Sequence, residues 1–364
     1  MATLSTLAGP FERASDVSMQ LHTLDPLSDS RWDDLVDSHP KASVFHDKGW
    51  LQALANTYGY RPIVLTSAPA GQRLRDGIVF CQVKSWITGR RLVSLPFSDH
   101  CEPLWDENGG SVELMEWMRA ECCREHWKYI ELRPLSLGED STSGMRESQS
   151  YSLHTLDLTP SLEHIFTRFH KNSIQRRIRR AEREQLSYET GRSEELLNAF
   201  YHLVVVTRRR HQALPQPRVW FRNLISSLGE KLQIRVAHKD GVPIAAILTL
   251  RHRNTVVYKY GCSDERFHSF AATPFLFWKL IEESKAASAE LIDFGRTDLD
   301  NAGLTTFKDH FGTARRRLTY LRYPESARGK GVMAADVPAV RRLFSLVPQA
   351  LLPWAGRLVY RHLG

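Results

Sequence analysis

Cysteine is scarce in this chain and is not arranged as a disulfide framework. The 364 residues include five cysteines, an odd number, scattered at Cys81, Cys101, Cys122, Cys123 and Cys262. Disulfide frameworks use even numbers at regular spacings, so we expect reduced and mostly buried thiols. Cys122 and Cys123 are neighbours in a helical pattern, and their side chains point apart. They are therefore a poor pair of metal ligands, and we expect no metal.

Long apolar runs are also absent. The sequence has no uninterrupted apolar stretch of about 18 residues, the length that a membrane-spanning helix needs. Its first residues do not combine positive charge with a sustained apolar run, as a signal peptide would. We therefore expect a cytoplasmic protein. A hydrophobic content of 42% is ordinary for a globular protein, and the length is sufficient for two domains.

The common nucleophile and metal motifs are missing as well. The chain contains no Gly-x-Ser-x-Gly elbow, no HExxH and no paired CxxC. Their absence disfavours hydrolases of the triad type and zinc proteases. It is compatible with acyl transfer, in which positioning and stabilisation of an oxyanion can provide most of the catalysis.

The most informative segment lies between residues 291 and 312. Residues 291–296 read Leu-Ile-Asp-Phe-Gly-Arg, which predicts a buried strand ending in polar groups. Residues 303–312 predict a short helix from which Lys308 projects. Ligand sites of α/β sheets lie at such strand ends. We therefore expect Asp293, Arg296 and Lys308 near one cleft, where Gly295 lets the backbone approach a ligand.

This segment resembles the C-terminal domain of the FemAB-like acyltransferases, a branch of the GNAT (N-acetyltransferase) superfold. The resemblance extends to BioF2-like acetyltransferase domains and to FemAB-related proteins of exopolysaccharide systems. In that family a DFGR strand end precedes a GL..FK..FG helix and a closing strand, for which residues 315–321 fit. Three segments of the N-terminal half are also similar, at 45–50, 91–99 and 129–133.

The order of predicted elements agrees with this resemblance. Helix, antiparallel strands, helix and strand occur in that order twice. We therefore expect an α/β (α+β) fold of tandem GNAT-like domains, each with a mixed, mostly antiparallel sheet flanked by helices. The expected division is a flexible N-terminus at 1–16, a first domain at 17–155, a second, acetyltransferase-like domain at 156–324, and a basic amphipathic tail at 325–364.

Apolar periodicity and turn residues predict the individual elements. Helices are expected at 48–58, 111–126, 161–185 and 194–211, with another beginning at Thr273-Pro274. Strands are expected at 61–67, 77–84, 90–95, 128–133, 231–239, 243–252 and 255–261.

Charged residues of the second domain are the first candidates for the site. The resemblance places a functional lysine at Lys308, which as a cation could hold a donor phosphate or an oxyanion; the alternative is a solvated helix lysine. Arg296 could clamp an acceptor phosphate or carboxylate. Asp293 could bind the acceptor or could serve as the structural partner of Arg296.

Two tyrosines of the strand at 255–261 are candidate proton donors. Alternation places Tyr258 and Tyr260 on one face of this strand and Lys259 on the other. In a GNAT fold this strand lines the donor cleft, so either hydroxyl could act as a proton donor. Aromatic packing is the alternative for both.

The first domain contributes polar residues after a strand end. Ser98, Asp99 and His100 follow Pro96-Phe97 and could contact an acceptor between the domains. Glu131 and Arg133 alternate on one face of a strand and are expected to pair with each other. Trp50 is expected in the core, and His46 as a helix cap.

The donor site lacks the usual glycines. Acetyl-CoA-dependent GNAT enzymes cradle the pyrophosphate with a Gly-rich loop, whereas residues 266–273 contain no glycine. The helix end at Thr273 could still bind an anion. The donor is therefore expected to be acyl-CoA or, as in some FemAB-like proteins, aminoacyl-tRNA.

Basic residues are concentrated in one segment. The formal charge is +8, and residues 168–183 hold seven Lys or Arg against one acid. Lys171, Arg176, Arg179 and Arg180 are therefore candidate contacts to a donor or to another polyanion such as tRNA. A solvated helix face is the alternative. The helical stretch at 161–211 is also too short for the long arm of the peptidoglycan-bridge enzymes.

The tail at 325–364 interleaves basic and apolar residues. It could lie as an amphipathic helix on an anionic membrane at the inner face, or it could pack back on the second domain. Pro348 and Pro353 would divide such a helix into short pieces.

The sequence as a whole therefore predicts an acyltransferase. It would move an acyl or aminoacyl group onto an amine or hydroxyl of a cell-envelope or polysaccharide precursor. One alternative is an aminoacyl-tRNA-dependent transferase acting on a peptidoglycan peptide. Another is a non-catalytic module that binds polyanions or membranes.

Overall fold

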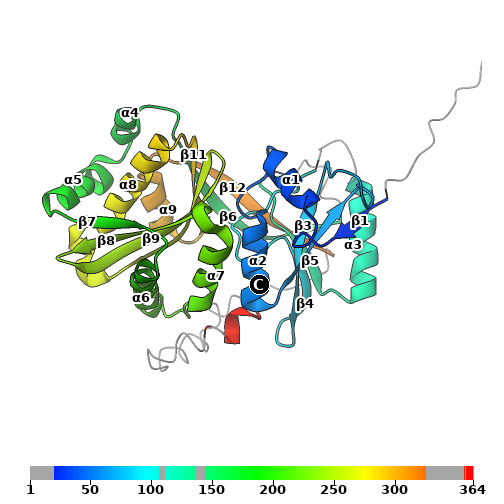
Figure 1. Ribbon diagram of the computed structural model, residues 1–364. Coiled ribbons are helices and arrows are strands. Elements are labelled where there is room, and N and C mark those ends of the chain that lie inside the picture. The colour runs from blue at the N-terminus through cyan, green and yellow to red at the C-terminus, as the bar shows by residue number, and fades with distance from the viewer. Residues whose placement is uncertain (1–19, 106–110, 137–143, 325–355, 357, 364) are drawn as a thin grey trace, which may run out of the picture.

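One mixed sheet runs through the whole molecule (Figure 1). The computed structural model describes residues 20–105, 111–136, 144–324, 356 and 358–363, and within them the sheet has 12 strands in the order β1-β2-β3-β4-β5-β12-β6-β11-β10-β9-β8-β7. The expected flexible terminus at 1–16 and most of the expected tail at 325–364 lie outside these described residues. We refer to residues 20–136 as the first half and to residues 144–324 as the second half.

The first half supplies five neighbouring strands of the sheet. Its elements are β1 His22–Leu24, α1 Arg31–Ser38, α2 Lys48–Tyr58, β2 Arg61–Thr66, β3 Ile78–Ser85, β4 Gly89–Val93, α3 Ser111–Glu125 and β5 Tyr129–Leu132. Asp47 caps the start of α2, where its carboxylate accepts the N–H of Gly49 at 2.8 Å, and Gly59 caps the end with a φ of 71°. His46 is therefore not the cap that was expected. Its ring instead contacts the N–H of Ser43 and the carbonyl of Glu102.

The second half supplies the other strands. Its elements are β6 Arg146–Asp157, α4 Leu162–Thr167, the π-helical turn η2 Lys171–Gln175, α5 Arg176–Arg183, β7 Ser187–Gly191, α6 Glu194–Arg210, α7 Arg218–Leu228, the 3-10 turn η3 Gly229–Lys231, β8 Leu232–Lys239, β9 Val242–His252, β10 Thr255–Ser263, the 3-10 turn η4 Glu265–Phe270, α8 Ala272–Ala286, β11 Leu291–Asp298, α9 Ala302–Asp309 and β12 Ala314–Tyr323.

The long helix expected at 161–185 is in fact divided into α4, η2 and α5. The division occurs at His170, which has non-helical backbone angles and whose Nδ1 accepts the N–H of Ser173 at 3.1 Å. A side chain that caps a new helical segment competes with continuation of the preceding helix. The apolar stripe continues across the break, because Ile165, Phe169 and Ile174 are all buried. Periodicity alone therefore could not reveal it.

Strand β12 joins the two halves. It pairs on one side with β5, with Leu321 opposite Leu132, and on the other side with β6, with Ala314 opposite Thr155. The chain thus closes the second half with a strand that hydrogen-bonds to the last strand of the first half. Residues at the ends of β4, β5, β10 and β11 consequently lie near one boundary.

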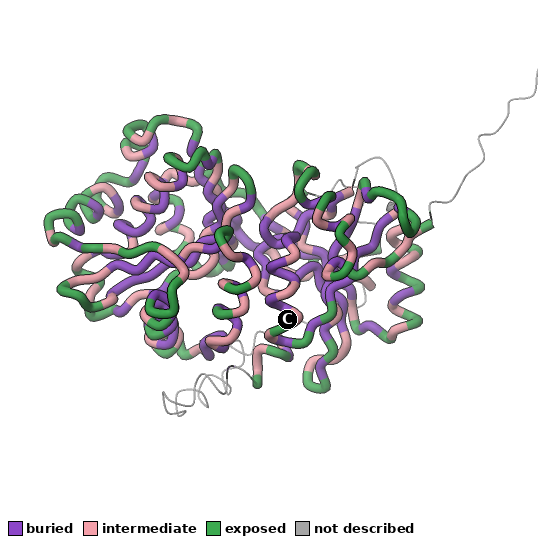
Figure 2. Tube along the Cα trace, viewed as in Figure 1, coloured by how far each residue is buried: buried purple, intermediate pink, exposed green. Residues whose placement is uncertain are grey.

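Helices cover both faces of the sheet, and the core is continuous across the boundary (Figures 1 and 2). One buried cluster contains residues of α2, α6 and α7, and here Trp50 and Trp220 pack edge to face at 5.3 Å. Helices α5 and α8 cover the opposite face of the second half. Gly49 allows the close approach of α2 to α7, because a Cβ there would overlap the carbonyl of Ser227.

Candidate functional site

Strand β11 carries the Asp-Phe-Gly-Arg sequence to the boundary between the halves. A β-bulge interrupts its pairing with β6 between Asp293 and Arg296, and Gly295 has a φ of 72°. The Asp293 carboxylate accepts the N–H of Gly295 at 2.7 Å. A Cβ on Gly295 would lie 3.1 Å from Oδ2 of Asp99. The glycine therefore allows the loop after β4 to approach β11.

A histidine from the first half meets Asp293. Nε2 of His100 lies 2.8 Å from Oδ2 of Asp293, and both side chains are buried. Nδ1 of His100 is also buried and has no hydrogen-bond partner among the described residues. With the proton on Nε2, the carboxylate fixes the ring and Nδ1 keeps its lone pair. This is the arrangement of an imidazole that can accept a proton.

Asp99, an acid of the first half, lies between two cations of the second half. Nζ of Lys259 lies 3.0 Å from Oδ1 of Asp99, and Nε of Arg296 lies 3.9 Å from the same oxygen. Burial alone would raise the pKa of the Asp99 carboxyl, but the two cations outweigh it and hold that pKa below its ordinary value. Burial lowers the pKa of Lys259, against the attraction of Asp99.

Arg296 is the more accessible member of this group. Its side chain is 22% exposed, against 6% for Lys259. The guanidinium donates to the hydroxyl of Tyr320 at 2.6 Å and lies over the ring of Tyr151 at 4.2 Å. The Tyr320 hydroxyl in turn donates to the backbone carbonyl of Asp99 at 2.6 Å. Two aromatic residues thus hold a positive group at the boundary.

Lys308 is buried beneath the β11 bulge. Only 2% of this residue is exposed, so the alternative of a solvated helix lysine is wrong. Its Nζ donates to the carbonyls of Gly295 at 2.9 Å and Arg296 at 3.1 Å. Burial lowers its pKa to about 8, although the Asp99 and Asp293 carboxylates oppose this shift. An ammonium has three protons, so one remains for another acceptor.

We call this group the junction cluster and define it as Asp99, His100, Lys259, Asp293, Arg296 and Lys308. The structure brings together the charged residues that the sequence singled out at both strand ends. It pairs them differently, because Asp293 contacts His100 and Gly295, whereas Arg296 contacts Tyr320 and Asp99. Ser98 does not share in these contacts, because its hydroxyl donates to the carbonyl of Leu95 at 2.8 Å.

The expected arrangement of the two tyrosines in β10 is wrong. A β-bulge between Tyr258 and Tyr260 reverses the alternation, so their rings pack on opposite faces of the sheet, against Phe277 and Phe221 respectively. Lys259 points to the same side as Tyr260 and lies 5.6 Å from its ring. The Tyr260 hydroxyl accepts hydrogen bonds from Trp220 at 2.9 Å and from Gln216 at 3.1 Å. Tyr258 packs tightly against Gly261.

A buried ion-pair network supports the cluster from β5 and β12. The expected pair of Glu131 and Arg133 is present at 2.9 Å, and Arg322 bonds the other carboxylate oxygen of Glu131 at 2.7 Å. Arg133 also donates to the carbonyl of Ser98 at 3.1 Å and lies over the ring of Tyr320 at 4.8 Å. This network fixes the loop that carries Asp99 and His100.

The candidate donor residues lie elsewhere in the second half. At the start of α8, Ala271 adopts the left-handed conformation with φ 59°, and Thr273 is half-buried. Nearby, Arg210 and His268 are 3.2 Å apart. Lys171, Arg176, Arg179 and Arg180 are exposed on η2 and α5, at the end of the molecule away from the first half (Figure 1). They are not part of the junction cluster.

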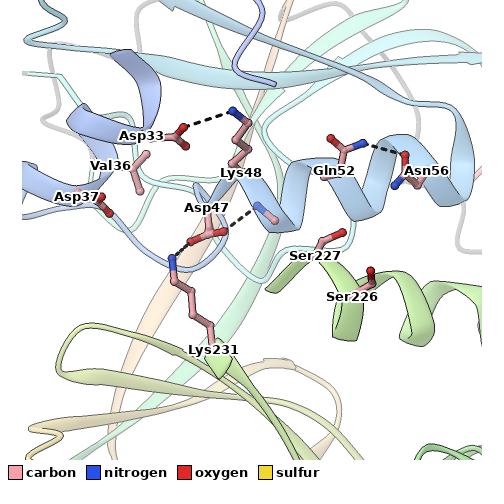
Figure 3. Close-up of a pocket in the computed structure, with 11 residues that line it drawn as sticks. Asp33, Val36, Asp37, Asp47, Lys48, Gln52, Asn56, Ser226, Ser227 and Lys231 are labelled. Carbon is pink, nitrogen blue, oxygen red and sulfur yellow. Dashed lines mark hydrogen bonds and ion pairs between the residues drawn. The ribbon is translucent and has the colours of Figure 1, made fainter. Parts of the chain in front are cut away.

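A separate polar cleft of about 600 Å³ lies where α1 and α2 face α7 (Figure 3). Its charged residues pair with each other: Lys231 with Asp47 at 2.5 Å and Lys48 with Asp33 at 3.4 Å. None of the junction cluster lines this cleft. Across the described ranges, no group of three or more His, Cys, Asp or Glu side chains is placed to hold a metal ion.

Residues 168–309 match the family model of the acetyltransferase (GNAT) domain. This segment of the second half is thus similar to a GNAT domain. The matched segment contains Lys259, Asp293, Arg296 and Lys308, while Asp99 and His100 lie outside it. No relative among the curated proteins matches the sequence.

Several solved structures share the fold of this chain over most of its length. FemX has 14% sequence identity and a TM-score of 0.67, over 84% of this chain and 97% of FemX. The C-terminal domain of a putative lysylphosphatidylglycerol synthetase from Agrobacterium fabrum has 13% identity and a TM-score of 0.54, over 80% and 90%. A tandem GNAT protein from the clavulanic acid biosynthesis pathway has 12% identity and a TM-score of 0.52, over 85% and 100%. The predicted FemAB-like, tandem GNAT fold is thus confirmed.

Three residues of the site escaped sequence reasoning. Lys259 was assigned to the wrong face of β10. Tyr320 was taken only as part of the expected closing strand at 315–321, and Arg322 lies just beyond that strand. One signal was available for Lys259, because a single lysine within an otherwise apolar and aromatic strand needs a buried partner. Nothing local distinguishes Tyr320, whose contacts all come from distant segments.

Proposed function

We propose that this protein transfers an acyl or aminoacyl group from an activated donor onto an amine or hydroxyl of a cell-envelope or polysaccharide precursor. The junction cluster would be the site of the reaction. The observation that carries this proposal is the buried His100 ring, with one nitrogen against Asp293 and the other without a partner among the described residues. An oriented imidazole in the same cluster as the buried Lys308 suits the activation of an acceptor and the stabilisation of an oxyanion.

His100 is proposed as the proton acceptor and Asp293 as the residue that positions it. As Nδ1 takes the proton of the acceptor, a new N–C or O–C bond forms at the donor carbonyl. The bond from that carbon to the sulfur of a thioester, or to the ribose oxygen of an aminoacyl-tRNA, then breaks. The proton returns from Nδ1 to this leaving atom, which balances the step.

Lys308 is proposed to stabilise the negative charge that develops on the donor carbonyl oxygen. Two of its protons are directed to the carbonyls of β11, which fixes the direction of the third. Preorganised donors of this kind are most effective where water is excluded. Arg296, which is partly exposed and held by two tyrosines, would bind a phosphate or carboxylate of the acceptor. Tyr258 and Tyr260 receive no role in proton transfer.

Acyl-CoA is the donor that we favour. The amino end of α8 follows a left-handed residue and lies beside Arg210 and His268, which together could replace the missing Gly-rich loop as a site for the diphosphate. The second candidate donor is aminoacyl-tRNA. It is supported by the exposed basic face that η2 and α5 present, with Lys171, Arg176, Arg179 and Arg180.

The donor is tested by titrating the purified protein with acetyl-CoA and, separately, with charged and uncharged tRNA at physiological salt. If acetyl-CoA binds saturably and R210A/H268A binds it more weakly, the result supports acyl-CoA as the donor. Preference for charged tRNA that is weakened in R176A/R179A/R180A supports aminoacyl transfer. R176A/R179A/R180A is the control for acetyl-CoA binding, and R210A/H268A is the control for tRNA binding. Binding of neither donor would contradict the proposal and favour a non-catalytic module.

The nature of the acceptor rests on the structural neighbours. A lysylphosphatidylglycerol synthetase domain is among them, which supports an acceptor with an anionic group. A cytoplasmic protein that works at the inner face of a membrane would suit such an acceptor. None of the helices in the described part of the chain is long and apolar enough to cross a bilayer.

A further inference from the structure

The hairpin between β3 and β4 presents two apolar side chains to solvent. Trp86 is 88% exposed and Ile87 is 59% exposed. The turn that carries them is held in place, because the Ser85 hydroxyl accepts the N–H groups of Ile87 at 3.1 Å and Thr88 at 3.0 Å. Large apolar residues at a fixed protruding tip are costly in water, so a binding role is the natural explanation.

The end of the chain lies beside this hairpin (Figure 1). His362 bonds to Ser85 at 3.0 Å, and its ring contacts Trp86 at 5.7 Å. Its backbone carbonyl accepts a hydrogen bond from Thr88 at 2.9 Å. The described chain end therefore packs on the first half, against the β3–β4 hairpin.

The hairpin also carries positive charge at its surface. The segment 84–91 contains no acid. Its Arg91 is buried and its Arg90 pairs with Glu125 at 2.8 Å, so the charge at the surface comes from Lys84. Lys84 and Arg361 are both exposed. An apolar tip accompanied by exposed cations is complementary to an anionic lipid bilayer, because the headgroups of such a bilayer are negatively charged and its interior is apolar.

We propose that Trp86 and Ile87 form a membrane-docking surface for an anionic lipid bilayer. Tryptophan favours the level of the lipid headgroups, because its ring is apolar and its indole N–H remains hydrogen-bonded there. A convex tip of two side chains can enter a soft bilayer. It offers too little contact area for a stable protein interface, which buries about 800 Å² on each partner. This assignment is independent of the acyl-transfer proposal.

The proposal is tested by flotation of the full chain with vesicles of mixed phosphatidylglycerol and phosphatidylcholine, and with vesicles of phosphatidylcholine alone. We expect binding to the mixed vesicles only, with an affinity about tenfold lower in W86S/I87S. The matched control is V242S. Val242 is 46% exposed in the β8–β9 hairpin, so V242S should bind as the wild type does. K84E should also weaken binding, and its fold should be unaffected because Lys84 is exposed.

Three results would overturn the assignment. Wild-type protein could fail to float with the mixed vesicles, W86S/I87S could bind as well as wild type, or V242S could lose as much affinity as W86S/I87S. Sedimentation analysis in the absence of lipid separates a different occupant. If wild-type protein dimerises at micromolar concentration and W86S/I87S does not, the surface binds a second copy of this chain rather than lipid.

Discussion

The imidazole of His100 and the carboxylate of Asp293 meet across the boundary between the two halves, with Nε2 and Oδ2 2.8 Å apart. The histidine follows β4 of the first half, and the aspartate lies on β11 within the GNAT domain of the second. Neither half alone holds the pair. The tandem arrangement therefore completes the proposed site, at the boundary where the two halves of the sheet join.

Removal of the imidazole should impair turnover more than folding. H100Q is expected to lower kcat roughly 100- to 10,000-fold, the usual contribution of general base catalysis, with little change in the Kd of the donor. D293N should lower kcat in the same direction, because the ring loses its orienting carboxylate. S98A is the matched control on the same loop. A kcat of H100Q close to that of wild type would refute the assigned role.

Lys308 should make the activity depend on pH near 8. Burial lowers its pKa to about 8, and the proposed role needs the cation. The protonated form disappears as the pH rises through this value, so kcat/KM should fall above pH about 8. K308R should retain activity to higher pH, because arginine stays charged. Activity that instead rises through pH 8 would identify Lys308 as a base.

Asp99 should matter for stability as well as for the site. D99N leaves Lys259 buried without its carboxylate, and removal of one partner of a buried pair typically costs about 3–5 kcal/mol of unfolding free energy. The double variant D99L/K259M should cost less, because neither charge remains. Urea unfolding measures both. Equal or greater loss in the double variant would contradict this account.

The Asp99 carboxyl also predicts how the stability of the protein changes as the pH falls. Because its pKa is held below the ordinary value in the folded state, its stabilising contribution is present at neutral pH and is lost as the pH falls through the folded-state pKa. The stability of D99N should therefore decrease less on acidification than that of the wild type. Parallel curves for the two proteins would show that Asp99 is not held in this way.

The tyrosines of β10 should be dispensable for proton transfer. Y258F and Y260F are expected to keep most of the wild-type kcat. Y260F should lose about 1–3 kcal/mol of stability, since Trp220 and Gln216 would then lack their shared acceptor. A large drop in kcat for either variant, without a change in KM or in melting temperature, would restore that tyrosine as a proton donor.

Much of the fold could be predicted because its signals are local. Apolar runs between turn residues predicted strands β2–β5 and β8–β10, and apolar spacing predicted α2. The break at His170 could not be predicted, because the buried face continues through it. The face on which Lys259 lies could not be predicted either, since a bulge decides it and bulges leave no clear local pattern.

Most residues of the junction cluster could be predicted, but their contacts with each other could not. The residues at the two strand ends were identified because ligand sites of α/β sheets lie at such ends. Their partners depend on contacts between segments 193 residues apart in the case of His100 and Asp293. Such contacts are determined by the joining of β12 to both halves, which no periodicity in the sequence reveals.

The most direct test of the account is an assay of donor deacylation by wild-type protein, H100Q and S98A, with a panel of amine and hydroxyl acceptors. Free thiol from acetyl-CoA or deacylated tRNA reports the transfer. The account predicts acceptor-dependent release by wild type and S98A, and little or none by H100Q. Release at wild-type rates by H100Q would contradict the claim that the junction cluster is the site of acyl transfer.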